Sequence, residues 1–159
     1  VFGVGNTHAR WMFIGEAPGA EEDRQGEPFV GRAGQLLTSM LKALGFRRDD
    51  VFIANVLKCG PPGNRDPKPD EARSCRAYLE RQIELVNPTL IIAVGRIAAQ
   101  NLLATETPLA RLRGRVHPLG TQKLTGFVSV ATELGIQAKT DSFAGLSEIP
   151  AAALPAASR

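Results

Sequence analysis

Three short apolar runs lie in the first two thirds of the chain, and each is followed by a residue that favours turns. The runs span residues 11–14, 51–54 and 90–94, and they end at Gly15, Asn55 and Gly95. Uninterrupted apolar runs of this length are typical of strands buried on both faces. A weaker run at 127–131 predicts one more strand.

Between these runs the apolar residues follow a helical period instead. One predicted helix begins near Ala33 and stops at Gly45, with an apolar face made of Leu36, Leu37, Met40, Leu41 and Leu44. A second is capped by Asp70 and has an inner face of Ala72, Cys75, Leu79, Ile83 and Val86. A third, rich in alanine, follows Gly95 and extends to about Leu103. The proline-rich stretch 60–69 is predicted to be a loop.

Alternating strands and helices predict an α/β fold: a single domain with a central, mainly parallel sheet and helices on both faces. In such sheets the ligand site lies at the carboxyl ends of the strands. The loops after Ile14 and Ala54 both begin there, so we expect them to lie together. The domain is predicted to cover residues 1–131. Residues 132–159 are poorly patterned and form a divergent C-terminal end, with a loose tail from Ala151.

Composition narrows the class of protein. Apolar residues make up 43% of the chain and charged residues 22%, which is typical of a soluble globular protein. No apolar run approaches the roughly 18 residues of a membrane span. Residues 1–10 lack a secretory signal, and two cysteines are too few for a disulfide scaffold. We therefore expect a cytoplasmic protein without a membrane partner. The net charge of +3 permits a nucleic-acid partner without requiring one.

The loop after Ile14 carries most of the candidate chemistry. Glu16 and Glu22 are possible acids or bases, and Phe29 is an aromatic residue within a glycine-rich loop, suited to stacking on a base. Each feature has a simpler interpretation when it is considered alone. The glycines can form a plain turn, Phe29 can be a core residue, the acids can be exposed, and Asn55 can be a turn residue.

The complete string favours the functional interpretation. The segment GEAPGAEEDRQGEPFVGRAG, residues 15–34, resembles the first motif of family 4 uracil-DNA glycosylases at every fixed position. The likeness continues through Asn55-Val-Leu-Lys-Cys59 and Pro69-Asp-Glu-Ala72, and it covers about the first 115 residues. The resemblance implies the three-layer αβα fold of that superfamily. It also implies a monomeric hydrolase of base-excision repair, which flips uracil out of DNA and cleaves its N-glycosidic bond.

The resemblance also implies roles for individual residues. Phe29 stacks on the flipped uracil, Asn55 reads its edge, and Gly15 and Ala17 line the pocket. Glu22 is the catalytic carboxylate and Glu16 shapes the site, although an exposed loop acid remains the alternative for each. Arg65, in the proline-rich loop, is expected to contact DNA phosphate.

Cys59 and Cys75 match two of the four cysteines that hold a [4Fe–4S] cluster in this family. The other pair normally precedes the equivalent of Val1, so we expect an N-terminally truncated chain with an incomplete cluster. An iron–sulfur interaction protein is a poorer interpretation because half of the ligands are missing.

The resemblance fails at the second catalytic motif, a His-Pro sequence expected near residues 131–135. The chain reads Val-Ala-Thr-Glu-Leu-Gly at 130–135, and His117-Pro118 lies about fifteen residues too early. We expect His117 to be a surface strand residue, and we attribute the divergent end to a shifted reading frame or to sequence divergence. The hypothesis is a uracil-DNA glycosylase with little turnover. The alternative is a non-catalytic nucleic-acid or nucleotide-binding module of the same fold.

Overall fold

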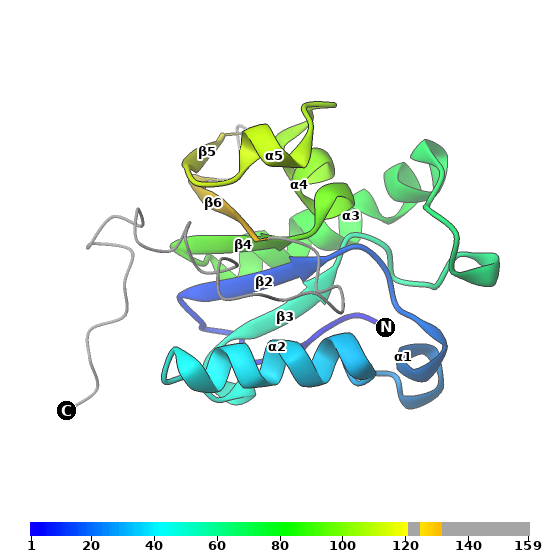
Figure 1. Ribbon diagram of the computed structural model, residues 1–159, viewed down its shortest axis with the longest axis horizontal. Helices are drawn as coiled ribbons and strands as arrows, with labels where there is room; N and C mark the ends of the chain where they lie inside the picture. The colour runs from blue at the N-terminus through cyan, green and yellow to red at the C-terminus, as the bar shows by residue number, and fades with distance from the viewer. Residues whose placement is uncertain (121–124, 132–159) are drawn as a thin grey trace.

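A six-stranded sheet forms the centre of the protein in the computed structural model, which describes residues 1–120 and 125–131. Its strand order is β1-β3-β2-β4-β6-β5, and the inner four strands are parallel (Figure 1). The two edge strands, β1 and β5, run antiparallel to their neighbours. The strands are β1 (Val4–Gly5), β2 (Trp11–Gly15), β3 (Phe52–Asn55), β4 (Leu90–Val94), β5 (Val116–Gly120) and β6 (Thr125–Ala131).

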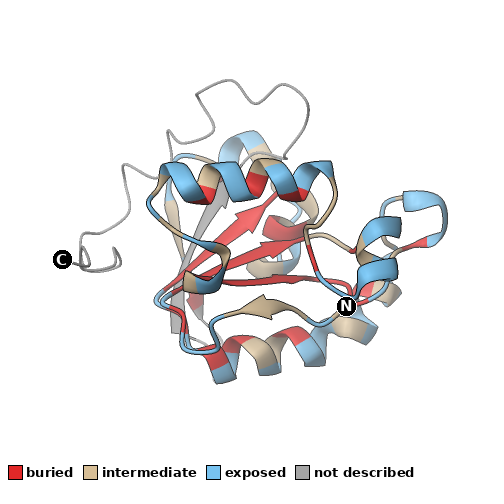
Figure 2. Cartoon of the chain, turned by 90° about the horizontal axis from the view of Figure 1, so that it is seen from below, coloured by how far each residue is buried: buried red, intermediate tan, exposed pale blue. Residues whose placement is uncertain are grey.

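Helices cover both faces of this sheet. They are α1 (Ala20–Gln25), α2 (Arg32–Ala43), α3 (Pro69–Val86), α4 (Arg96–Leu103) and α5 (Leu109–Leu112), with short 3-10 turns η1 (Arg48–Asp50) and η2 (Pro62–Asn64). Figure 2 shows β2, β3 and β4 buried between helices whose outer surfaces are exposed. No helix in the described part of the chain is long and apolar enough to cross a membrane.

The alternation of side chains along each strand divides the interior into two cores. The first core contains Met12 and Ile14 of β2 and packs against α3 and α4. The second contains Trp11 and Phe13 of the same strand and packs against Leu37 and Leu41 of α2. This two-sided burial explains why the strands are apolar at consecutive positions.

The predicted fold class is confirmed, including the parallel strand at 127–131, which extends over Thr125–Ala131. Strand β5 contains His117, which was expected on a strand. Helices α1 and α5 and strand β1 were not predicted. Helix α1 contains only AEEDRQ and buries none of its side chains, so it has no apolar period to detect. Strand β1 is two residues long, and α5 has four residues. The predicted C-terminal end, 132–159, lies outside the described residues.

The N-terminus of α3 differs from the prediction. The helix begins at Pro69 and Lys68 is its N-cap, so Asp70 lies within the first turn. Glu71 closes the turn, since its carboxylate accepts a hydrogen bond of 2.7 Å from the Lys68 amide. Proline at the first helical position needs no partner for its nitrogen, which explains why the N-cap lies two residues earlier, at Lys68 instead of Asp70.

Candidate functional site

The carboxyl ends of β2 and β3 bring the two unusual loops together, as predicted. Gly15 is the register partner of Asn55 in the parallel pair. The contact continues beyond the strands, because the Val56 amide donates to the Gly15 carbonyl at 2.9 Å and the Leu57 amide donates to the Glu16 carbonyl at 3.0 Å. The two loops therefore leave the sheet side by side.

Gly15, Phe29 and Asn55 converge at this edge. A methyl group on Gly15 would lie 2.4 Å from Cζ of Phe29 and 2.6 Å from Oδ1 of Asn55. Both distances are well inside van der Waals contact, so only glycine fits here with the ring and the amide in place. The three residues that the sequence assigned to one pocket are thus neighbours.

Asn55 is buried, with 2% of its surface exposed. Its backbone carbonyl accepts a hydrogen bond from Nζ of Lys58 at 2.8 Å. Its side-chain Oδ1 is the one buried polar side-chain atom without a hydrogen-bond partner among the described residues. A buried acceptor without a partner costs about 1–3 kcal/mol, so this position calls for a ligand that donates a hydrogen bond.

Phe29 has a strained backbone, with φ at 56°. Its ring is half-buried and packs against the second core. Gly34 of α2 lies against its backbone: a methyl group there would be 1.8 Å from the Phe29 carbonyl oxygen. Any other residue at position 34 would clash with this carbonyl, so Gly34 allows helix α2 to lie directly against the loop.

The Glu22 carboxylate connects the beginning and the end of the loop that follows β2. Its Oε1 accepts hydrogen bonds of 2.9 Å from the amides of both Val30 and Gly31, and its Oε2 accepts one of 3.1 Å from the Gly19 amide. Partial burial alone would raise the pKa of Glu22, but these amides stabilise the carboxylate and together hold the pKa below its usual value. Glu22 is therefore ionised at neutral pH and shapes the loop around Phe29.

Glu16 and Ala17 follow β2 directly. Both are half-buried, and Ala17 packs against the first core. Glu16 is held through its backbone carbonyl, as described above, at the point where the loop leaves the sheet. These positions place both residues beside the Gly15–Asn55 pair.

A buried lysine, Lys58, is the main residue of the site that sequence reasoning missed. Its Nζ donates to the Asn55 carbonyl, to Oε1 of Gln82 at 2.6 Å and to the Phe2 carbonyl at 3.3 Å. Burial lowers the pKa of Lys58 to about 8, although the nearby Cys75 sulfur opposes the shift. Lys58 follows an apolar run, and this local sequence alone does not predict whether the lysine is buried or exposed.

Cys75 contacts the backbone of Lys58, the residue that precedes Cys59. The Lys58 amide donates to the Cys75 sulfur at 3.4 Å, the kind of bond that stabilises a thiolate ligand. However, a [4Fe–4S] cluster needs four thiolates, and the sequence contains two cysteines. The described residues contain no group of three or more potential metal ligands. The residues present therefore do not make a complete cluster site.

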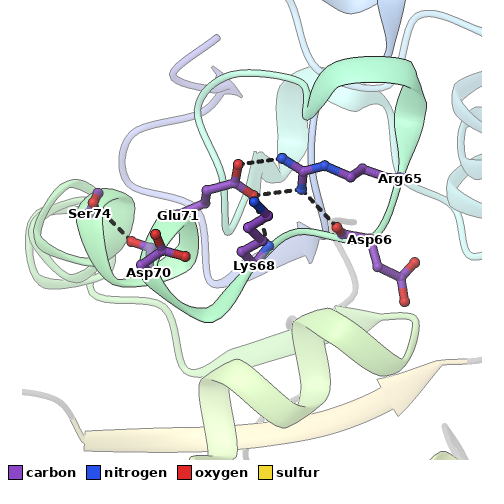
Figure 3. A network of polar contacts seen from close by, with 6 residues as sticks. All are labelled: Arg65, Asp66, Lys68, Asp70, Glu71 and Ser74. Atoms are coloured by element: carbon purple, nitrogen blue, oxygen red, sulfur yellow. Dashed lines mark hydrogen bonds and ion pairs between the residues drawn. The ribbon is translucent and has the colours of Figure 1, made fainter.

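Arg65 lies in the loop before α3 and forms a two-pronged ion pair. Its guanidinium donates to both carboxylate oxygens of Glu71, at 2.6 and 2.8 Å, and Figure 3 shows the two groups facing each other. The hydrogen bond from Arg65, assisted by the Lys68 amide, holds the pKa of Glu71 at about 2. Asp66 points away from this pair and bonds to Arg96 at 2.8 Å. Contact between Arg65 and DNA stays a prediction.

His117 lies on the edge strand β5, away from the pocket residues in the sheet order. Its Nε2 is 2.8 Å from the Leu112 carbonyl, and the ring is half-buried. The segment that stands in place of the second catalytic motif begins at the end of β6, and residues 132–135 lie outside the described residues.

A small, mainly apolar groove lies elsewhere, between α3, α4 and β5. Leu79, Leu102 and Leu119 are among the residues that line it, and its charged rim residues Arg76 and Glu80 pair with each other. It presents no convergent set of unpaired polar atoms. The Gly15–Phe29–Asn55 cluster is therefore the stronger candidate site.

Comparison with known proteins identifies the family. A family model described as the uracil DNA glycosylase superfamily matches residues 2–142. The chain is 55% identical to a type-4 uracil-DNA glycosylase of Archaeoglobus fulgidus, over 72% of this chain and 60% of that protein. It is 46% identical to a type-4 enzyme of Thermotoga maritima, over 78% of this chain and 66% of that protein. A Sulfurisphaera tokodaii enzyme of the same type is 56% identical, over 72% and 54%. The chain thus spans about half to two thirds of these relatives.

Proposed function

Because the chain belongs to the uracil-DNA glycosylase superfamily, we propose that it binds uracil flipped out of DNA between Phe29 and Asn55 and cleaves the N-glycosidic bond. The observation that carries this proposal is the buried Oδ1 of Asn55, which has no partner within the described part of the protein. A glycosylase must extrude its target base, and stacking together with edge recognition offsets the cost.

The Asn55 amide has the hydrogen-bonding groups that uracil requires. Its oxygen accepts from the uracil N3–H, and its nitrogen donates to O4. Cytosine presents an acceptor and a donor in the opposite places, so it would leave both amide atoms unpaired in a buried site. Sites of this kind reject the mismatched base strongly, because unpaired buried groups are costly. Phe29 supplies the stacking surface, and Gly15 leaves room beside both groups.

Glu22 is proposed as the catalytic carboxylate. In glycosidic cleavage the uracil leaves as an anion and the sugar becomes cation-like, so a fixed negative charge nearby lowers the barrier. Glu22 is ionised, and its Oε2 accepts a hydrogen bond from the Gly19 amide. A carboxylate oxygen can accept more than one bond, so Oε2 is proposed to orient water as well. Glu16 is proposed to shape the pocket floor from the end of β2.

A second candidate function is uracil binding with little turnover. The observation that favours it is the sequence at 130–135, which contains no histidine, while His117 is bonded to the Leu112 carbonyl on an edge strand. A missing donor to the leaving group lowers the rate of cleavage by about 10²–10³.

The [4Fe–4S] cluster, if it forms with thiolates from outside this sequence, would use Cys59 and Cys75. We also propose a cytoplasmic monomer; two cysteines are too few for a disulfide scaffold, which favours a reducing compartment.

Binding and turnover can be measured separately. Single-stranded oligonucleotides carrying one 2′-fluoro-2′-deoxyuridine, which resists cleavage, test recognition against the cytosine counterpart. We expect a preference for uracil that disappears in Asn55→Leu, while stability is unchanged or higher, because the variant removes an unpaired polar atom. Equal binding of both oligonucleotides by the native chain would refute the pocket. Single-turnover excision of deoxyuridine then decides between the two candidates: rapid cleavage excludes the binding-only function.

A further inference from the structure

We propose that Arg48 is a positioning residue that holds the Phe29 ring in its place for base stacking. Arg48 lies in η1, immediately before β3, and belongs to neither of the motifs that resemble the glycosylase family. Its guanidinium reaches across to the loop after β2 and bonds to the backbone of Phe29 itself. The consequence for DNA binding rests on the proposed function, whereas the loop geometry does not.

The backbone of Phe29 requires an external constraint. Its φ of 56° lies in the left-handed region, which a bulky side chain avoids. The other non-glycine residues in this region, within the described part of the chain, are Asn64, Asn87 and Ala104. Two of them, Asn87 and Ala104, are helix C-caps, where this conformation is common. Phe29 is neither a helix cap nor an asparagine, so its conformation comes from the contacts around it.

Arg48 supplies a two-pronged contact on the carbonyl side of the loop. Its Nη2 donates to the Pro28 carbonyl at 2.8 Å, and its Nη1 donates to the Phe29 carbonyl at 3.1 Å. Nη1 also lies 3.4 Å from Oγ1 of Thr38 on α2. The rigid guanidinium can span two successive carbonyls, which a lysine ammonium on a flexible stem does poorly. Because η1 leads directly into β3, these bonds tie the loop to the sheet.

Glu22 supplies the opposite contact on the amide side. Its Oε1 accepts from the amides of Val30 and Gly31, the two residues that follow Phe29. A cation therefore holds the carbonyls of 28 and 29, and an anion holds the amides of 30 and 31. These contacts fix three consecutive peptide groups, 28–29, 29–30 and 30–31, from two sides. The Phe29 ring is fixed with them, beside Gly15 and the Asn55 amide.

The test compares Arg48→Met with Arg47→Met. Arg47 immediately precedes η1, its side chain is 80% exposed, and it pairs with Asp50, so it controls for loss of an arginine from the same turn. The first measurement is amide hydrogen exchange by NMR, which needs no DNA. We expect exchange at Val30 and Gly31 to be about tenfold faster in Arg48→Met, and unchanged in the sheet and in Arg47→Met. Equal exchange in the two variants, or acceleration spread evenly over the sheet, overturns the proposal.

The second measurement is the preference for 2′-fluorouracil over cytosine oligonucleotides. We expect Arg48→Met to lower this preference about tenfold, because fewer molecules hold the competent loop. In a Phe29→Ala background the same substitution should cause no further loss. A loss of the same size in both backgrounds overturns the proposal, as does full preference in Arg48→Met.

The variant Arg48→Lys keeps the positive charge but removes the two-pronged guanidinium. It also provides the test if Arg48→Met fails to fold. We expect the lysine variant to retain faster exchange at Val30 and Gly31. Native-like exchange and uracil preference in that variant would show that charge alone suffices and would overturn the two-pronged role. If the native chain itself shows no uracil preference, the proposed function fails, while the exchange data still decide whether Arg48 holds the loop.

Discussion

Replacing Gly15 with alanine tests the pocket by steric means. The added methyl group would lie 2.4 Å from Cζ and 2.9 Å from Cε2 of Phe29, and 2.6 Å from Oδ1 of Asn55. Carbon atoms in contact sit about 3.5–4.0 Å apart, so the ring must move by about 1 Å or more. The φ of Gly15 lies outside the left-handed region, so the strand tolerates alanine and the cost comes from overpacking, about 1–3 kcal/mol of unfolding free energy.

Urea denaturation gives that free energy, and binding to uracil-containing and cytosine-containing single-stranded DNA gives the preference. Gly31→Ala is the matched control, because its methyl group would meet only Oε1 of Glu22, at 3.4 Å, and the amide that donates to Glu22 remains. We expect the control to change stability by no more than about 0.5 kcal/mol. A Gly15→Ala protein that keeps the native uracil preference would refute the assignment of the pocket to Phe29 and Asn55.

Three further predictions concern charged groups. Glu22→Gln should lower the unfolding free energy by about 1–3 kcal/mol at neutral pH, measured in urea. The backbone amides stabilise only the ionised carboxylate, and this is why the pKa of Glu22 is lowered in the folded protein. The difference in unfolding free energy between the native protein and Glu22→Gln should therefore vanish as the pH falls through the folded-state pKa of Glu22. Lys58 titrates at about 8 when folded and above 10 when unfolded, so native stability should rise between those values, and Lys58→Met should lack this rise. Arg65→Gln should raise the pKa of Glu71 from about 2 toward its ordinary value, as carboxyl NMR titration would show; an unchanged pKa would contradict the pairing.

The strands and long helices could be predicted because burial on two faces leaves a direct trace in the sequence. Residues 90–94 are apolar throughout since both cores contact β4. Helix α1 leaves no such trace, because all of its residues except Ala20 are polar. At its start Glu22 accepts a hydrogen bond from the amide of the N-cap residue, Gly19. The N-cap of α3 was predicted two residues late, at Asp70 instead of Lys68, because Pro69 and Glu71 together set that terminus.

The candidate site was predicted in part, and the limit has a physical cause. The meeting of Gly15 with Asn55 follows from parallel topology alone, since both residues end adjacent strands. The roles of Arg48 and Lys58 could not be predicted, because each depends on which backbone carbonyls the folded chain brings within reach of a long side chain. Neither residue differs in local sequence from an exposed basic residue.

The departures from ordinary folding rules gather at one place. Asn55 has a buried acceptor without a partner, Phe29 holds a backbone conformation that aromatic residues avoid, and Lys58 is a buried cation. Each reduces stability, yet all three lie on the two loops at the carboxyl ends of β2 and β3, and contacts from Glu22, Arg48 and Gln82 maintain two of them. Nothing within the described residues satisfies the third, the Asn55 oxygen. In the proposed complex the uracil N3–H would donate to this oxygen. The proposed binding of a planar, hydrogen-bonding base would therefore account for the stability that these three residues cost the protein.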